Sequence, residues 1–315
     1  MLNLRLFGRG DADYYERRLD GFPCHQEFLL LCYLLINKRQ PLFREKLASV
    51  FWGNYSNVTA RKCLRNALYR LRQQLEAVGA DSGQYLWVTE ESVEFIDNSP
   101  HWVDVETFDS ITSRYQSCRV ENLLPEQVAE LKKGVELYTG DLLERVYQDW
   151  CLYERERLRL SYLEALNKLM LYSTLHQEYD QGLAYGANIL SLDPTREEVH
   201  RQMMLLYWLK RDPYAALAQY KRCVKILKDE IGVQPVWDTQ ILYDRMVNNE
   251  FEPFLDHQGR EFSLSDFSAA KGNQKDLELL QRYLEKLQDK VSQISRDIEQ
   301  VQKLVYQIHE VHPQD

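Results

Sequence analysis

The chain has 315 residues, of which 44% are hydrophobic and 28% charged, and its formal net charge is −9. This composition excludes a disordered or fibrous protein and predicts a globular one with two or more domains. The longest apolar run, residues 28–36, is about half the length that a bilayer-spanning helix needs. The first residues also lack the layout of a signal peptide, so we expect a cytoplasmic protein with no membrane partner.

The first 98 residues combine short strands with helices. The predicted elements are strands at 2–7, near 14–19 and near 21–24, helices at 25–40, 44–52 and 60–75, and a hairpin formed by 84–89 and 93–97. Pro41 and Gly53 separate the helices, and Thr59 is a candidate N-cap for the third. Strands, three helices and a hairpin in this order predict a winged helix-turn-helix domain.

The predicted helix at 60–75 carries five basic residues and no acidic one. On a helical wheel at about 100° per residue, one face is apolar and predicts the core side, formed by Ala60, Leu64, Ala67, Leu68, Leu71 and Leu75. The centre of the opposite face is polar and consists of Lys62, Asn66, Tyr69 and Gln73. Arg65 and Arg72 flank one edge of this polar face, and Arg70 flanks the other.

A helix sorted in this way fits the major groove of DNA. The central side chains are our candidates for reading base edges, because amide, amine and hydroxyl groups can hydrogen-bond there. The candidates for phosphate contacts, which supply affinity and salt dependence, are Arg61, Arg65, Arg70 and Arg72. An ordinary solvated helix is the alternative that this segment alone leaves open.

Charge is unevenly distributed along the chain. Residues 1–98 hold 13 basic and 12 acidic residues, so the net negative charge belongs to the remainder. The turn of the predicted hairpin is nevertheless acidic, with Glu90, Glu91 and Glu94. We expect these carboxylates to repel DNA phosphates rather than to contact them.

Residues 104–249 have a helical pattern almost throughout. A Leu-Ala pair recurs at 183–184 and 217–218, an offset of 34 residues, which is the length of a tetratricopeptide repeat. Tyrosine, leucine and alanine at helix-pair spacing favour the same architecture. The region therefore predicts an all-α, tetratricopeptide-like domain.

The end of the chain shows the most regular pattern. Residues 253–273 lack any period and predict a linker, whereas 274–312 carry an uninterrupted heptad repeat. Its apolar seam consists of Leu277, Leu280, Leu284, Leu287, Val291, Ile294, Ile298, Val301, Val305 and Ile308. The repeat predicts a coiled coil that makes a homo-oligomer, with a dimer favoured and a trimer left open. The alternative is an amphipathic helix that packs back on the protein.

Residue constellations for catalysis are missing from the sequence. It has no phosphate-binding Gly-x-x-x-x-Gly-Lys loop, no Gly-x-Gly-x-x-Gly and no Gly-x-Ser-x-Gly. Glu197 and His200 share a helix face, and we interpret them as structural rather than as metal ligands. The six cysteines form no Cys-x-x-Cys pair and are interpreted as reduced thiols. We therefore expect a protein that is not an enzyme and has no cofactor or metal.

A family resemblance joins these observations. Residues 42–75, LFREKLASVFWGNYSNVTARKCLRNALYRLRQQL, resemble the helix-turn-helix of the SARP-type family of transcriptional activators, and the layout of 1–98 resembles its OmpR-like winged helix. The family's bacterial transcriptional activator domain is resembled by the segments VDVETFDSI, YTGDLLE, DWCLYERERLRLSYLEAL, LDPTREEVHRQMMLLYWLKRDPYAALAQYKRCVKILKDEIGVQP and LYDRM. The resemblance covers about residues 1–250, and the acidic hairpin turn and residues 253–315 depart from it.

The resemblance implies a division of labour. The third helix, at 60–76, would read promoter DNA, and the activator domain would help to recruit RNA polymerase at the bacterial nucleoid. We expect a mainly α protein with a small α+β winged helix-turn-helix domain at 1–98, an activator domain at 101–252, a linker at 253–273 and a coiled-coil helix at 274–312. The alternative function is a tetratricopeptide adaptor that binds proteins and has little affinity for DNA.

Overall fold

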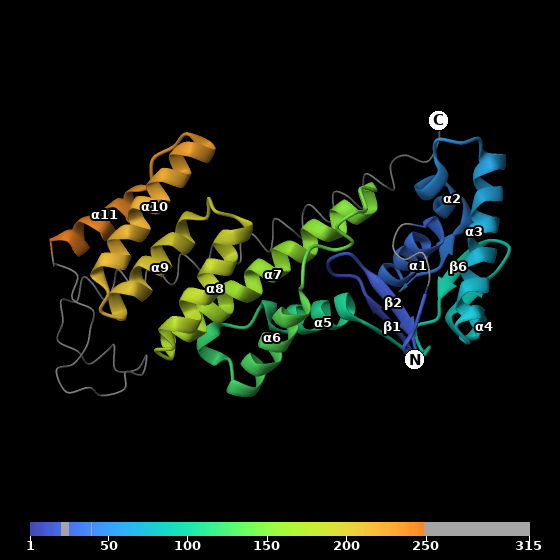
Figure 1. The fold of residues 1–315 in the computed structure, drawn as a ribbon, viewed down its shortest axis with the longest axis horizontal. Helices are drawn as coiled ribbons and strands as arrows, with labels where there is room; N and C mark the ends of the chain where they lie inside the picture. The colour runs from blue at the N-terminus through green and yellow to red at the C-terminus, as the bar shows by residue number, and fades with distance from the viewer. Residues whose placement is uncertain (20–24, 39, 249–315) are drawn as a thin grey trace. The chain divides into compact units, whose positions relative to one another are not determined.

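The computed structural model describes residues 1–19, 25–38 and 40–248. Residues Met1–Leu206 form one compact unit, and a second begins at Tyr207, within helix α9 (Figure 1). The predicted strand near 21–24, the linker at 253–273 and the coiled coil at 274–312 lie outside the described residues.

The N-terminal sheet has the strand order β3-β2-β1-β7. Its strands are β1 (Leu2–Arg5), β2 (Asp11–Tyr14), β3 (Arg17–Arg18) and β7 (His101–Val103). The strand predicted near 14–19 is divided, because Tyr15 and Glu16 have positive φ angles of 44° and 67° and form a tight hairpin turn. Strand β7 pairs with β1 in parallel, so the chain returns to the first strand before the helical region begins.

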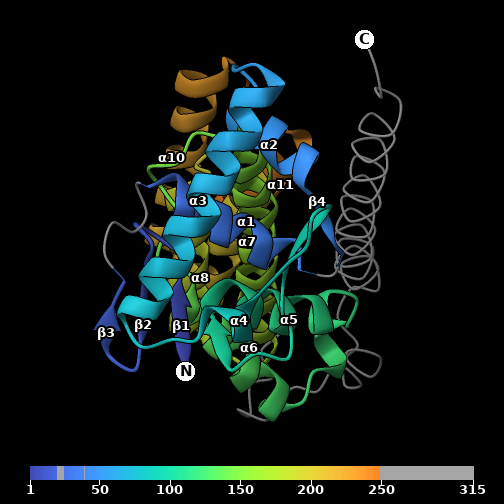
Figure 2. The same cartoon turned by 90° about the vertical axis from the view of Figure 1, so that its right-hand side faces the viewer.

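The helices of the winged fold follow the predicted order. They are α1 (Gln26–Ile36), α2 (Arg44–Trp52), α3 (Asn57–Ala77) and the short α4 (Ser82–Tyr85). Helix α1 is buried along most of its length, as its apolar sequence requires, and packs behind α3 (Figure 2). The predicted hairpin forms from β5 (Leu86–Val88) and β6 (Ser92–Phe95), and the unpredicted strand β4 (Leu42–Phe43) pairs with β6.

Helices make up the rest of the first unit. They are α5 (Asp104–Gln116), the 3-10 turn η1 (Val120–Asn122), α6 (Pro125–Leu137), α7 (Asp149–Leu175), α8 (Tyr179–Leu192) and α9 (Glu197–Leu209). The long α7 packs against α5, α6 and α8. A Cβ atom added at Gly134 of α6 would lie 2.9 Å from Ile111 of α5, and one at Gly186 of α8 would lie 2.8 Å from Met203 of α9. The two glycines therefore permit close packing of α6 on α5 and of α8 on α9.

The second unit is described as far as Asn248. It contains α10 (Pro213–Ile231) and α11 (Trp237–Val247), whose Tyr220 and Tyr243 rings stack with centroids 4.0 Å apart. Asp212 caps the start of α10 by accepting a hydrogen bond from the backbone N–H of Ala215, and Gly232 ends it with a φ of 71°. The repeated Leu-Ala pairs at 183–184 and 217–218 occupy the fifth and sixth positions of α8 and α10, as equivalent helices of a repeat would.

The winged helix and the first activator helices share one hydrophobic core, which runs from Leu2 to Leu158. At its centre the buried carboxylate of Asp104 accepts hydrogen bonds from the backbone N–H groups of Leu6 at 2.8 Å, Phe7 at 3.1 Å and Val105 at 2.7 Å. Burial raises the pKa of Asp104, and these hydrogen bonds only partly offset that effect. The Phe7 ring packs edge-on against Phe108 of α5 with centroids 5.3 Å apart.

A loop between α6 and α7 completes this junction. The backbone of Leu6 and Gly8 exchanges hydrogen bonds with Asp141, Leu143 and Glu144 at 2.8–2.9 Å. The guanidinium of Arg155 on α7 holds the same loop, because it donates to the carbonyls of Leu142, Leu143 and Val146. The residues that follow the first strand are therefore tied by backbone hydrogen bonds to the loop between α6 and α7.

Replacement of Asp104 by alanine tests this junction. The variant Asp104→Ala leaves the buried N–H groups of Leu6 and Phe7 without an acceptor, and we expect the free energy of unfolding to fall by about 3 kcal/mol. Urea denaturation followed by circular dichroism measures the change. Ser110→Ala, at an exposed position of the same helix, is the matched control. Equal midpoints for the two variants would contradict the role of Asp104.

Candidate nucleic-acid interface

Helix α3 begins earlier than the sequence predicted. Its N-cap is Ser56, whose hydroxyl accepts a hydrogen bond from the backbone N–H of Thr59 at 3.4 Å, so Thr59 lies inside the first turn rather than at the cap. The predicted core face is confirmed, because the buried residues of the helix are Ala60, Leu64, Ala67, Leu68, Leu71 and Leu75. The opposite face is therefore fixed toward solvent.

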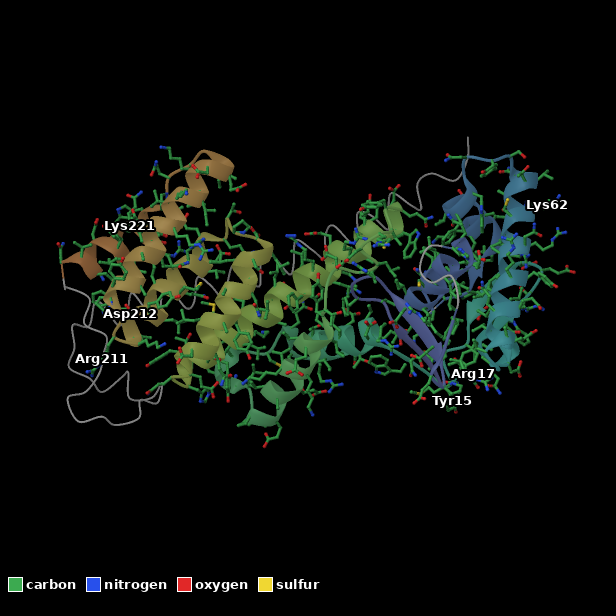
Figure 3. The ribbon with its side chains drawn as sticks, viewed as in Figure 1. Tyr15, Arg17, Lys62, Arg211, Asp212 and Lys221 are labelled. Atoms are coloured by element: carbon green, nitrogen blue, oxygen red, sulfur yellow. The ribbon has the colours of Figure 1, made fainter. Side chains whose placement is uncertain are left out.

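The predicted base-reading residues form one exposed stripe along α3. Lys62, Asn66, Tyr69 and Gln73 are all exposed, and Tyr69 retains 64% of its accessible surface. Figure 3 shows Lys62 extending from the outer side of the helix. Gln73 Nε2 lies 3.5 Å from Glu76 Oε2, whereas the side chains of Lys62, Asn66 and Tyr69 make no hydrogen bond or ion pair within the described chain. These three polar groups are free to bind a ligand.

The four predicted phosphate-binding arginines differ in their surroundings. Arg61 forms an ion pair with Glu45 of α2, so its charge is already partly neutralised. Arg65 and Arg72 form no ion pair with any described residue, and the buried Nε of Arg72 has no hydrogen-bond partner there. Arg70 is exposed on the other border of the stripe. Unpaired positive charge thus concentrates on the Arg65–Arg72 edge.

A third arginine joins that edge, and our sequence analysis did not find it. Arg44, at the start of α2, lies close enough to Arg65 and Arg72 that their charges affect its ionisation. Burial lowers the pKa of Arg44, and repulsion from these two guanidinium groups lowers it further. Bringing an anion to this edge would relieve the repulsion. The available signal was a basic residue in the first turn of the helix that packs on α3.

Arg44 also positions the hairpin turn. Its backbone N–H donates to the carbonyl of Glu91 at 2.8 Å, and its Nη1 donates to the carbonyl of Thr89 at 3.1 Å. The Thr89 hydroxyl in turn accepts from the backbone N–H groups of Glu91 and Ser92. The turn is therefore tied to the start of α2 by hydrogen bonds, while the side chains of Glu90 and Glu91 are exposed and form no ion pair with a described residue.

The other predicted features have structural partners. Nε2 of His200 lies 3.0 Å from the carbonyl oxygen of Pro194, and Glu197 lies 3.5 Å from the guanidinium of Arg201. Within the described ranges, no group of three or more potential metal-ligating side chains comes together. Among the helices described, none is long and apolar enough to cross a membrane. Cys32, Cys63, Cys118, Cys151 and Cys223 are free thiols.

Comparison with known proteins links both regions to gene regulation. Residues 103–246 match the bacterial transcriptional activator domain, and residues 24–89 match the C-terminal domain of transcriptional regulatory proteins. Transcriptional regulatory protein MoaR1 of Mycobacterium tuberculosis is 21% identical over 220 residues, which cover 69% of this chain and 70% of MoaR1. Regulatory protein AfsR of Streptomyces coelicolor is 25% identical over 237 residues, which cover 74% of this chain and 23% of AfsR.

A solved structure has the same fold. Mycobacterium tuberculosis EmbR, in complex with a low-affinity phosphopeptide, superposes with a TM-score of 0.64 and is 20% identical. The match covers 81% of this chain and 66% of the EmbR chain, so this chain spans slightly less than two thirds of EmbR. At this identity the likeness supports the fold alone.

The difference between Arg61 and Arg65 gives a test of the interface. We expect Arg65→Gln to reduce the salt dependence of binding to duplex DNA by about one unit of slope, because it removes an unpaired charge. Arg61→Gln should have a smaller effect, since Glu45 already offsets that charge. Fluorescence anisotropy across a salt series measures both slopes. Glu45→Gln, which frees Arg61, should raise affinity, and equal losses for Arg61→Gln and Arg65→Gln would contradict this ranking.

Proposed function

Because this chain belongs to the SARP-type family of transcriptional regulators, we propose that it is a transcription activator whose α3 binds promoter DNA in a sequence-specific manner. The observation that carries the proposal is the exposed polar stripe of α3 beside the unpaired cluster of Arg44, Arg65 and Arg72. Like charges held together without acids are costly in a free protein. They are favourable once the phosphates of a DNA strand lie against them.

Base reading and phosphate binding fall to different side chains in this proposal. Asn66 and Gln73 have the amide groups that pair with adenine in the major groove, and Lys62 can donate to guanine. Tyr69 adds a hydroxyl and an aromatic face between them. Phosphate contacts come from Arg65, Arg70, Arg72 and Arg44, with Arg61 in a smaller role. The acidic turn at Glu90–Glu91 makes no phosphate contact, so affinity rests on α3 and the start of α2.

Tethering would compensate for such a limited interface. We propose that residues 1–98 bind DNA, that 101–252 form the activator domain, and that the heptad segment 274–312 follows a linker at 253–273 and makes a homo-oligomer. Linking two DNA-binding units makes the second binding event intramolecular and can raise overall affinity without new contacts. A dimer is the state we favour, whereas the heptad residues, leucine in the first half of the seam and β-branched residues in the second, leave a trimer open.

Activation would follow from recruitment of RNA polymerase by the DNA-bound protein. The support for this step is the match of residues 103–246 to the bacterial transcriptional activator domain. Transcription in vitro from a template with the selected binding site tests it. Output no higher than that of polymerase alone would contradict recruitment.

A protein-binding adaptor is the second candidate. Its support is the exposed acidic turn, where Trp87 of the hairpin also keeps 60% of its surface accessible. Such a surface suits a basic protein better than it suits DNA. The following measurement separates the two functions.

We expect the full chain to bind duplex DNA with steep salt dependence. The triple variant Arg44→Gln/Arg65→Gln/Arg72→Gln should lower the slope of log K against log salt by about 2.7, because three phosphate contacts are lost. Elution from a DNA column and anisotropy titrations measure this. The charge-matched control Arg119→Gln/Lys133→Gln/Arg145→Gln, at exposed positions of the activator domain, should retain the wild-type slope. Absence of salt-sensitive binding by the wild type would favour the adaptor.

The oligomer is tested by breaking the apolar seam in the full chain. We expect Leu287→Lys/Ile294→Lys to convert the oligomer to a monomer, because charges at core heptad positions oppose helix association. Light scattering measures the mass in solution. Gln293→Lys/Gln300→Lys adds the same charge outside the seam and should leave the mass unchanged. A monomeric wild type would contradict the proposed homo-oligomer.

A further inference from the structure

Helix α10 has the same unusual composition as α3. Residues 213–228 of α10 contain four basic residues and no acidic one. Residues 57–75 of α3 contain five basic residues and likewise no acidic one. The other helices of the described chain after residue 100 are neutral or net negative, and α10 is net positive. A second long stretch of helix with basic residues and no acidic one, in an acidic region, therefore needs an explanation of its own.

The basic side chains of α10 line up on its solvent side. The buried face consists of Ala216, Gln219, Cys223 and Leu227. The opposite face carries Lys221, Lys225 and Lys228, spaced four and three residues apart, with Arg222 at its edge, and all four are exposed. We name Lys221, Lys225 and Lys228 the cationic stripe. Figure 3 shows Lys221 extending away from α10, and Tyr214, which is 84% exposed, continues the stripe toward the start of the helix.

The cationic stripe forms no ion pair within the described chain, although Asp229 follows Lys225 by four residues. None of its three lysines, nor Arg222, forms an ion pair with any described residue. Some basic residues on neighbouring helices are paired instead: Arg157 binds Glu154 and Asp109, and Arg201 binds Glu197. Like charges four residues apart on a helix are mildly destabilising, so the stripe is a cost unless a polyanion binds there.

The side chains of the stripe favour a nucleic acid over a protein as this polyanion. Lysine is depleted at the centres of protein interfaces, which are usually built around a buried aromatic or arginine side chain. No large apolar side chain lies between Lys221, Lys225 and Lys228 on this face of α10, and Ala218 is the small residue that precedes them. Lysine side chains suit phosphate contacts that carry no sequence information, and the exposed hydroxyl of Tyr214 can donate to a phosphate as well. DNA is the polyanion that the proposed function already brings to this chain.

We propose that the cationic stripe of α10 is a second DNA-contact surface, which binds phosphates without base specificity. The inference rests on the proposed function, since it requires that the protein is bound to DNA. The cationic stripe would add affinity for DNA from the activator domain, beyond the affinity that α3 supplies.

The test compares salt dependence for variants of the full chain on a random-sequence duplex of about 60 base pairs. We expect Lys221→Gln/Lys225→Gln/Lys228→Gln to reduce the slope by about 2.7, so that between about 50 and 200 mM salt the wild type weakens about 40-fold more than the variant. Lys221→Arg/Lys225→Arg/Lys228→Arg should keep the wild-type slope. The activator-domain control Arg119→Gln/Lys133→Gln/Arg145→Gln should also keep it. Thermal unfolding by circular dichroism confirms that the exposed changes leave the fold intact.

The outcomes separate this inference from the proposed function. An unchanged slope for the glutamine variant, together with a loss for Arg44→Gln/Arg65→Gln/Arg72→Gln, overturns the second surface and leaves DNA binding by α3 in place. A wild type without salt-sensitive binding overturns both. If the glutamine variant keeps its DNA slope but loses retention on a poly-glutamate column, the stripe binds an acidic protein and the inference is wrong.

Discussion

The buried carboxylate of Asp104 is the interaction on which the DNA-binding half depends. It takes hydrogen bonds from the start of α5 and from the residues that follow β1, so the first strand and the first activator helix are fixed at one point. Burial of this charge is unfavourable by itself, and three N–H donors offset much of the cost. The result is a single core from Leu2 to Leu158. The winged helix is therefore built onto the activator helices rather than joined to them by a flexible segment.

This junction holds the helices of the winged fold, including α3, in fixed positions against the first activator helices. Arg155 fixes the loop that pairs with Leu6 and Gly8, and the Trp150 ring of α7 packs 5.3 Å from Tyr33 of α1. Helix α1 supports α3 from behind, which leaves its polar stripe toward solvent. Several basic side chains on the described helices are paired with acids, among them Arg114, Arg157 and Arg201. Our proposals assign DNA to two surfaces whose basic side chains form no ion pair with a described residue: the cluster of Arg44, Arg65 and Arg72, and the cationic stripe of α10.

Periodicity predicted most of this architecture. The core face of α3 follows from its spacing residue by residue, and so do the bounds of α2 and the hairpin of β5 and β6. Interactions between distant segments could not be predicted: the parallel pairing of β7 with β1, and the approach of Arg44 to Arg65 and Arg72, depend on how the elements pack. The ion pair of Arg61 with Glu45 could not be predicted either, because it depends on how α2 packs against α3. Short strands such as β4 carry too few residues to show a period.

The central claim is that Lys62, Asn66, Tyr69 and Gln73 read base edges. Selection of bound sequences from a random duplex library, with the full wild-type chain and with Asn66→Ala, tests it most directly. Our account predicts a short enriched motif for the wild type, and a loss of preference at one or two of its positions for the variant. The same motif from both proteins, or no enrichment with the wild type, would contradict the claim.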